Sequence, residues 1–219
     1  MNGSFFQTDY EDKQEDVILP GTDGAVTLTL VQNASAASMD GIELELLWIP
    51  VEGLTLNANM GLLDAAYESY IVTGPSGNPV DKTGFDLRKA PESTFTVGAL
   101  WELPLANGNF LVSSINYRWK DDFWNNGNTG GPKHYSSDQL YVEALGILDA
   151  SINYETENWR LSIFGKNLTD QGYFMHAVDV GGAYDSTATD STPIYQPPLW
   201  SFATISRPRY FGAEIEYEF

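Results

Sequence analysis

Two-residue alternation of apolar and polar side chains is the feature that most constrains this chain. The C-terminal residues show it most clearly, because apolar side chains occupy every second position and glutamates lie between them. The apolar set is Phe211, Ala213, Ile215, Tyr217 and Phe219, and the glutamates are Glu214, Glu216 and Glu218. Such a pattern puts the two sets on opposite faces of a β-strand. Helical periodicity is hard to find in the sequence, so an all-β fold is predicted.

The alternation recurs in about eight segments, each predicted to be a strand. They span residues 4–15, 26–49, 53–68, 92–104, 109–121, 140–155, 158–170 and 207–219, the second with a bulge near residues 34–40. Short turns and long polar loops alternate between them. The turns lie at 50–53, 105–108 and 155–158, and the loops at 16–25, 70–91, 122–139 and 172–206. This predicts an antiparallel up-and-down sheet with its turns at one end and its loops at the other.

A sheet with one apolar and one polar face fits two architectures. In an outer-membrane β-barrel the apolar face meets lipid and the polar face meets a wet lumen. In a soluble β-sandwich the apolar face forms the core. The loop asymmetry favours the barrel, and so do aromatic residues near the strand ends, which we expect in two interfacial girdles. These residues are Trp48, Tyr67, Tyr70, Trp101, Trp119, Phe123, Tyr154, Trp159 and Phe219.

Composition narrows the classes of function. The formal net charge of -19 argues against nucleic-acid binding. The chain has no Cys and only two histidines, His134 and His176, so neither a thiolate site nor a multi-histidine metal or haem site is expected, and no cofactor is predicted. The sequence contains no nucleotide-binding or hydrolase motif, and the glutamate stripe is more simply a solvated wall. Catalysis is therefore not expected.

The C-terminal quarter carries the most informative motifs. Residues 159–170 read Trp-Arg-Leu-Ser-Ile-Phe-Gly-Lys-Asn-Leu-Thr-Asp, and Tyr173 follows them. This resembles the end of a TonB-dependent outer-membrane receptor of the siderophore-receptor type. In that family a penultimate strand ends in Asn-Leu-Thr-Asp, a Tyr follows, and Pro-Arg-x-x-Gly enters the last strand. The matching positions are Asn167, Leu168, Thr169, Asp170, Tyr173, Pro208, Arg209 and Gly212.

Earlier segments resemble the same family in the expected order. They are Phe6-Gln-Thr-Asp-Tyr10, Gly41-Ile-Glu-Leu-Glu45, Leu63-Asp-Ala-Ala-Tyr67 and Ala90-Pro-Glu92. The resemblance thus covers essentially the whole chain. It implies that residues 1–219 are the C-terminal portion of a larger transmembrane barrel of the 22-strand type, with the plug domain and signal peptide absent.

The resemblance also implies a function and a set of partners. The implied function is uptake of a large nutrient, such as a ferric siderophore, across the bacterial outer membrane, energised by the TonB complex through the missing plug. Other implied partners are outer-membrane lipid, lipopolysaccharide and the barrel assembly machinery, which would read Tyr217 and Phe219. Ligand contacts are expected from loop residues, although packing within a loop or girdle is the competing interpretation for each. The candidates are Tyr184, Tyr195, Trp200 and His176, with Trp124 and Tyr135 behind them.

Two other hypotheses remain at this stage. A small closed eight-stranded barrel would serve a structural or adhesive role, but its narrow lumen would hold many carboxylates with few cations. The acidic residues are Glu43, Glu45, Glu102, Glu214, Glu216 and Glu218, and the basic residues available to pair with them are Arg118, Lys120, Arg160 and Lys166. Unpaired buried carboxylates are costly, which favours a wide, wet lumen. A secreted β-sandwich binding module would instead gather its aromatic residues in one patch.

Overall fold

The computed structural model describes residues 1–19, 28–73, 79–125, 141–180, 183–185, 194–196 and 200–219. Eight strands form one antiparallel sheet in the order β1–β2–β3–β5–β6–β9–β10–β15. Their bounds are β1 (Asn2–Leu19), β2 (Leu28–Val51), β3 (Leu54–Thr73), β5 (Ser93–Pro104), β6 (Phe110–Lys120), β9 (Leu145–Glu155), β10 (Trp159–Lys166) and β15 (Tyr210–Tyr217). Each strand pairs with the next long strand of the chain, so the predicted up-and-down order is confirmed.

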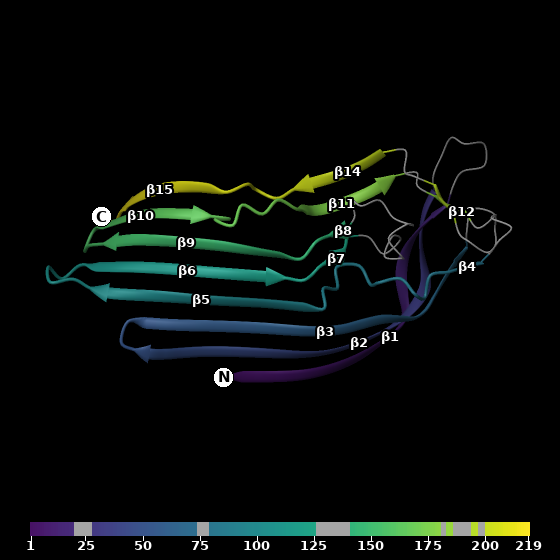
Figure 1. Cartoon of the computed structure of the whole chain (residues 1–219), viewed down its shortest axis with the longest axis horizontal. Helices are drawn as coiled ribbons and strands as arrows, with labels where there is room; N and C mark the ends of the chain where they lie inside the picture. Colours follow the sequence, from purple (N-terminus) through teal and green to yellow (C-terminus); the bar gives the residue numbers. More distant parts are fainter. Residues whose placement is uncertain (20–27, 74–78, 126–140, 181–182, 186–193, 197–199) are drawn as a thin grey trace.

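The sheet is an open arc rather than a closed barrel or a sandwich. β1 and β15 are its two edges, and among the described residues no pairing joins them. The strands lie side by side in one layer (Figure 1). The remaining described strands form only short hairpins or flank β3. The part of the chain that the structure describes contains no helix long and apolar enough to cross a membrane.

The two kinds of connection separate to opposite ends of the sheet, as predicted. The turns β2–β3, β5–β6 and β9–β10 lie at the left of Figure 1, which we call the turn end, and the longer connections lie at the right, the loop end. Short strands also form at the loop end, and all but β8 (Tyr141–Val142), which lies in the predicted strand 140–155, fall where the sequence predicted loops. These are β4 (Pro79–Asp81), which pairs with β3, and the pairs β7 (Phe123–Trp124) with β8 (Tyr141–Val142), β11 (Phe174–Val180) with β14 (Trp200–Ile205), and β12 (Ala183–Asp185) with β13 (Ile194–Gln196).

The register of the sheet brings most of the apolar residues of the alternating segments onto one face. In one row across the sheet, Ile215 pairs with Leu161, Leu161 with Tyr154, and Tyr154 with Leu111. This face is open, because Ile215 keeps 70% of its side-chain surface exposed. A soluble sheet would bury such a face, whereas a barrel wall presents it to lipid. The sandwich hypothesis is therefore wrong.

Aromatic residues collect at both ends of the apolar face. At the turn end, the rings of Trp159 and Tyr217 lie 4.6 Å apart. Towards the loop end, the rings of Phe95 and Trp119 stack with centroids 6.1 Å apart. These positions agree with the predicted girdles.

Three predicted girdle residues lie elsewhere. Phe123 belongs to the short strand β7, outside the long sheet. Tyr67 and Tyr70 are 4% and 0% exposed and lie on the polar face. Tyr67 keeps the period of two that puts the odd-numbered residues of β3 on this face. Tyr70 lies beyond an extra residue, Glu68, where the β2–β3 register shifts. A one-residue bulge reverses the alternation beyond it, so Tyr70 joins Tyr67 on one face.

The polar face carries ion pairs, which follow the predicted pairing only in part. Arg160 contacts both Glu155 and Glu216 at 3.0 Å, as expected of a basic residue on the glutamate-rich wall. Arg118 and Lys166 instead contact Asp149, at 2.9 Å and 3.5 Å.

The Asn-Leu-Thr-Asp segment is a tight turn that ties the last strands together. Asn167 is 7% exposed and has a positive φ of 51°. Its Nδ2 donates hydrogen bonds to the carbonyl oxygens of Gln171 at 2.9 Å and Arg207 at 3.0 Å. Its Oδ1 accepts a hydrogen bond from the Gln171 N–H at 3.0 Å. The Asn167 side chain thus bonds to the backbone of its own turn, and one of these hydrogen bonds reaches the segment that enters β15.

Other residues of the motif complete this connection. Thr169 Oγ1 donates to the carbonyl of Gly146, next to the start of β9, at 2.7 Å. Asp170 Oδ1 accepts from the backbone N–H of Arg209 at 3.2 Å. Pro208 lies two residues before β15 begins, as its missing N–H requires. The motif therefore joins β9, β10 and the entry to β15.

Gly212 lies where two strands pack closely. A Cβ atom at this position would lie 2.3 Å from Cζ of Phe164, the register partner of Gly212 on β10. The Phe164 ring therefore covers the glycine on the polar face, and a larger residue would displace it.

Candidate functional site

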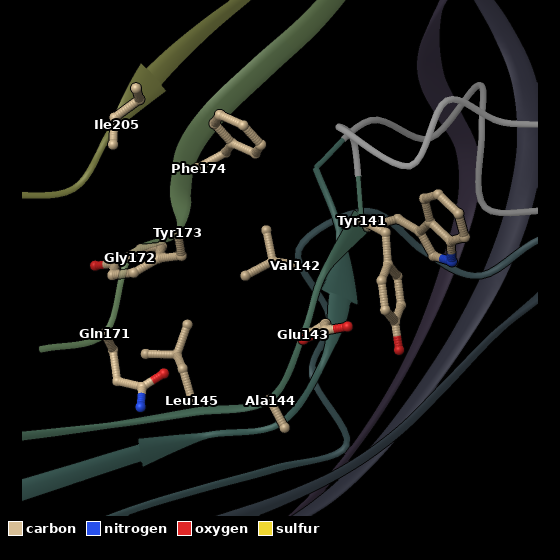
Figure 2. A pocket seen from close by; sticks show the side chains of 11 residues that line it. Tyr141, Val142, Glu143, Ala144, Leu145, Gln171, Gly172, Tyr173, Phe174 and Ile205 are labelled. Carbon is tan, nitrogen blue, oxygen red and sulfur yellow. The ribbon is translucent and has the colours of Figure 1, made fainter. Parts of the chain in front are cut away.

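A cavity of about 570 Å³ lies at the loop end. Its lining includes four aromatic side chains, from Trp124, Tyr141, Tyr173 and Phe174, and two polar ones, from Glu143 and Gln171. Figure 2 shows Tyr173, Phe174 and Ile205 on one side of the cavity and Tyr141 and Val142 on the other. The volume lies in the range of sites that bind small molecules, and the lining combines aromatic rings with polar groups.

The two sides of the cavity come from separate connections that pack together. Trp124 on β7 pairs with Tyr141 on β8, and their ring centroids are 5.0 Å apart. The indole of Trp124 is buried and packs against Ala177 of β11. Asn125 Nδ2 donates a hydrogen bond to the carbonyl of Phe174 at 3.3 Å. These contacts hold the β7–β8 and β11–β14 hairpins together as one rim.

Trp124 also joins this rim to residues 81–92, which we call the strap. Its Nε1 donates a hydrogen bond to Asp86 Oδ2 at 3.1 Å. Its carbonyl accepts a hydrogen bond from the backbone N–H of Lys89 at 2.7 Å. Trp124 therefore contacts segments that three different connections supply.

The strap packs on the polar face of β3. Leu87 joins a buried cluster that contains Ala37, Tyr67, Tyr70 and Val72. Burial lowers the pKa of Lys82 to about 8, and its Nζ lies 5.6 Å from the centroid of the Tyr70 ring.

A buried carboxylate lies beside this cluster. Glu15 is 2% exposed, accepts a hydrogen bond from the Tyr67 hydroxyl at 2.8 Å and forms an ion pair with Lys13. The guanidinium of Arg88 in the strap is 4.0 Å from the same carboxylate. The strap is thus held by apolar packing and by charge.

Carboxylates surround the aromatic cavity. Tyr141 donates its hydroxyl to Asp122 Oδ2 at 2.6 Å. The pKa of Tyr141 is raised to about 12, first by this hydrogen bond, then by burial and by the charges of Asp122, Glu143 and Asp121. Burial also raises the pKa of Asp86, with a smaller contribution from Asp122. The described part of this wall therefore places three acidic side chains, Asp86, Asp122 and Glu143, beside its aromatic rings.

A second, smaller cavity of about 240 Å³ lies against Trp124, which lines both. Its other lining residues include five acidic side chains: Asp64, Asp86, Glu92, Asp121 and Asp122. Within the described ranges, no three His, Asp or Glu side chains are placed to hold one metal ion. The described acidic residues therefore contribute negative charge to the rim and are not arranged as a set of metal ligands.

Comparison with known proteins identifies the family. A family model described as "TonB dependent receptor-like, beta-barrel" matches residues 1–168. The chain belongs to this family. Receptors of this family are transporters and not enzymes, in agreement with the absence of catalytic motifs from the sequence.

Three receptors of known structure share the fold. The alignment with the ferric yersiniabactin uptake receptor FyuA from Yersinia pestis covers 99% of this chain and 27% of the FyuA chain, with a TM-score of 0.67 and 18% sequence identity. The alignment with the siderophore receptor PiuA from Acinetobacter baumannii covers 98% of this chain and 25% of the PiuA chain, with a TM-score of 0.63 and 16% sequence identity. The alignment with the ferric preacinetobactin receptor BauA from Acinetobacter baumannii covers 99% of this chain and 27% of the BauA chain, with a TM-score of 0.54 and 18% sequence identity. This chain therefore spans about a quarter of the length of these receptors.

The structure brings only some of the predicted contact residues to the cavity. Trp124 lines it, whereas His176 is exposed on β11 and is not part of the lining. The backbone pairs Tyr184 with Tyr195 across β12 and β13, and Trp200 with Val180 across β14 and β11. Tyr135 lies outside the described residues.

Sequence reasoning missed Tyr141 and Phe174 as cavity residues, and it selected Tyr173 only as part of the family motif. All three are aromatic residues near the ends of predicted strands or loops. That position is a usable signal, but it also describes girdle residues.

Proposed function

We propose that residues 1–219 form the C-terminal portion of a larger receptor barrel in the bacterial outer membrane. Three observations support this: the family match, the open arc with its exposed apolar face, and the quarter-length alignment to complete receptors. The receptor would take up a large nutrient such as a ferric siderophore, and TonB would supply the energy through a plug domain.

The observation that carries the ligand part of this proposal is the aromatic cavity at the loop end. In outer-membrane barrels the short turns face the periplasm and the longer loops face outward. On this orientation the cavity faces the external medium, where a ligand arrives. Tyr184, Tyr195, Trp200 and His176, on the neighbouring short strands, are proposed as outer contacts of the same ligand.

The remaining partners are proposed from the surface of the sheet. The apolar face would contact lipid, and the outer rim would contact lipopolysaccharide. Phe219 is fully exposed, with its ring 4.9 Å from that of Tyr217. These two residues are proposed as the signal that the barrel assembly machinery reads.

The test uses the receptor expressed from its own gene, with native flanking sequence, in cells that lack other siderophore receptors. Uptake of radioactive iron from ferric siderophores is measured, and we expect it to require TonB. Tyr141→Ala removes one aromatic wall and should raise the half-saturating concentration about tenfold, the usual effect of truncating a central aromatic contact. The control Trp159→Phe changes an aromatic residue at the turn end and should leave uptake unchanged. TonB-independent uptake, or equal uptake by wild type and Tyr141→Ala, contradicts the proposal.

A further inference from the structure

The walls of the aromatic cavity are bordered by negative charge. Glu143 lines the cavity and is exposed. Asp122 is hydrogen-bonded to the hydroxyl of Tyr141, and Asp86 to the indole of Trp124. Two of the four aromatic rings therefore carry a carboxylate as a direct partner.

Among the described residues that line the cavity there is no Lys or Arg. Lys120 places its Nζ 5.1 Å from the centroid of the Phe123 ring, and Lys89 contributes its backbone N–H to Trp124. Arg209 forms an ion pair with Asp170 at 3.3 Å. The acidic lining of the second cavity, against Trp124, extends the negative field further.

Ferric siderophores differ in charge according to the groups that hold the iron. Three catecholates bring six negative charges to Fe³⁺ and leave a strongly anionic complex. Three hydroxamates bring three negative charges and leave a neutral complex, or a cationic one where the backbone carries a free ammonium group. Like charges brought together at a binding surface cost free energy, whereas aromatic faces attract cations.

We propose that this cavity selects neutral or cationic ferric siderophores, of the trihydroxamate type, over anionic tricatecholate complexes. The inference rests on the proposed uptake function and names the substrate class of the same cavity. It follows from the juxtaposition of Trp124 and Tyr141 with Asp86, Asp122 and Glu143.

The experiment compares three iron complexes on the same full receptor in outer membranes. The first is a ferric trihydroxamate with one free ammonium group, the second is the same molecule with that amine acetylated, and the third is a ferric tricatecholate. The first two differ in one charge and little else. The ammonium-bearing trihydroxamate is loaded with radioactive iron, and each unlabelled complex competes with it for binding. The competition is measured at low and at physiological salt concentration.

A pair of substitutions tests whether the named residues are responsible. Glu143→Gln should weaken binding of the ammonium form about twofold to fivefold, the size expected of a solvent-exposed charge pair, and leave the acetylated form unchanged. Glu157→Gln removes the same charge in the β9–β10 turn, at the other end of the sheet, and should change neither. Higher salt should reduce the difference between the two trihydroxamates.

The outcomes separate this inference from the proposed function. Tightest binding by the ammonium form, loss of that preference in Glu143→Gln, and weak binding of the tricatecholate support the inference. Equal or better binding of the tricatecholate overturns the charge inference and leaves siderophore uptake intact. Equal losses for both trihydroxamates in Glu143→Gln also overturn it, because the residue then acts through structure rather than charge. Failure to bind any of the three complexes overturns both proposals.

Discussion

Asn167 provides the most quantitative test of how the C-terminal strands are connected. Its amide makes three hydrogen bonds to the backbone of Gln171 and Arg207, and its φ of 51° lies in the left-handed region. Each hydrogen bond contributes about 1 kcal/mol, and left-handed backbone costs a residue such as Ala about 1 kcal/mol more than Gly. We therefore expect Asn167→Ala to lower the free energy of unfolding by about 4 kcal/mol and Asn167→Gly by about 3 kcal/mol.

Asn167→Asp distinguishes the contribution of the two Nδ2 hydrogen bonds from that of the Oδ1 hydrogen bond. Aspartate tolerates the left-handed conformation and keeps an acceptor for the Gln171 N–H, but it loses both Nδ2 donors. The expected loss is about 2 kcal/mol, from two hydrogen bonds. The order of stability is then wild type, Asp, Gly and Ala.

The assay is urea unfolding of the full receptor in detergent. Unfolding is followed by tryptophan fluorescence and by gel electrophoresis, in which the folded, unheated barrel migrates differently from the heated, unfolded chain. Asn158→Ala is the matched control, because the exposed Asn158 amide makes one long hydrogen bond, 3.3 Å, to the Glu218 carbonyl. It should cost less than about 0.5 kcal/mol. If Asn167→Ala is as stable as Asn158→Ala, the motif does not hold the strands as described.

Three further outcomes follow from the polar face and the strap. Gly212→Val should lower the urea midpoint, because its Cβ would lie 2.3 Å from Phe164 Cζ, and adding Phe164→Ala should restore part of the loss; additive effects in this pair would contradict the packing. Tyr67→Phe removes the hydroxyl that donates to the buried Glu15 and should cost about 1–3 kcal/mol in the same assay, whereas no change would mean that Glu15 is satisfied without it. Lys82 has a folded pKa near 8 against an ordinary value of 10.5, so its contribution to stability is fully present above pH 10.5 and is lost as the pH falls through 8. The stability difference between wild type and Lys82→Met should therefore shift in favour of wild type as the pH rises through that window, and a constant difference would refute the burial of the ammonium.

Much of the sheet could be predicted because each long strand separates two different environments. A strand between lipid and a wet lumen must alternate along its whole length, so the period of two survives even where local residues vary. The last strand shows this best, since Ile215 and Glu216 face opposite sides in the sequence pattern and in the register. The end of the penultimate strand was indicated only by the resemblance to the family, in which that strand ends in Asn-Leu-Thr-Asp. β10 ends at Lys166, four residues before the predicted end at 170.

The loop end could not be predicted in the same way. Tyr70 was assigned to a girdle because nothing in the sequence marks the extra residue at Glu68, which reverses the alternation beyond it. Tyr67 was assigned by its place near the strand end, although the period of two puts it on the polar face. The ladder of β7 and β8 is two residue pairs long, too short to leave a period. The cavity depends on Trp124 meeting Ala177, a contact between separate connections that only the folded chain specifies. Aromatic residues there follow no local rule that distinguishes ligand contacts from packing.

The most direct test of the central claim is to read the DNA upstream of the Met1 codon in the source genome. The account predicts an open frame that continues for several hundred codons and encodes more alternating strands, a plug domain and an export signal. An in-frame stop codon close upstream, with no export signal between it and Met1, would contradict the claim that these 219 residues are part of a TonB-dependent uptake receptor.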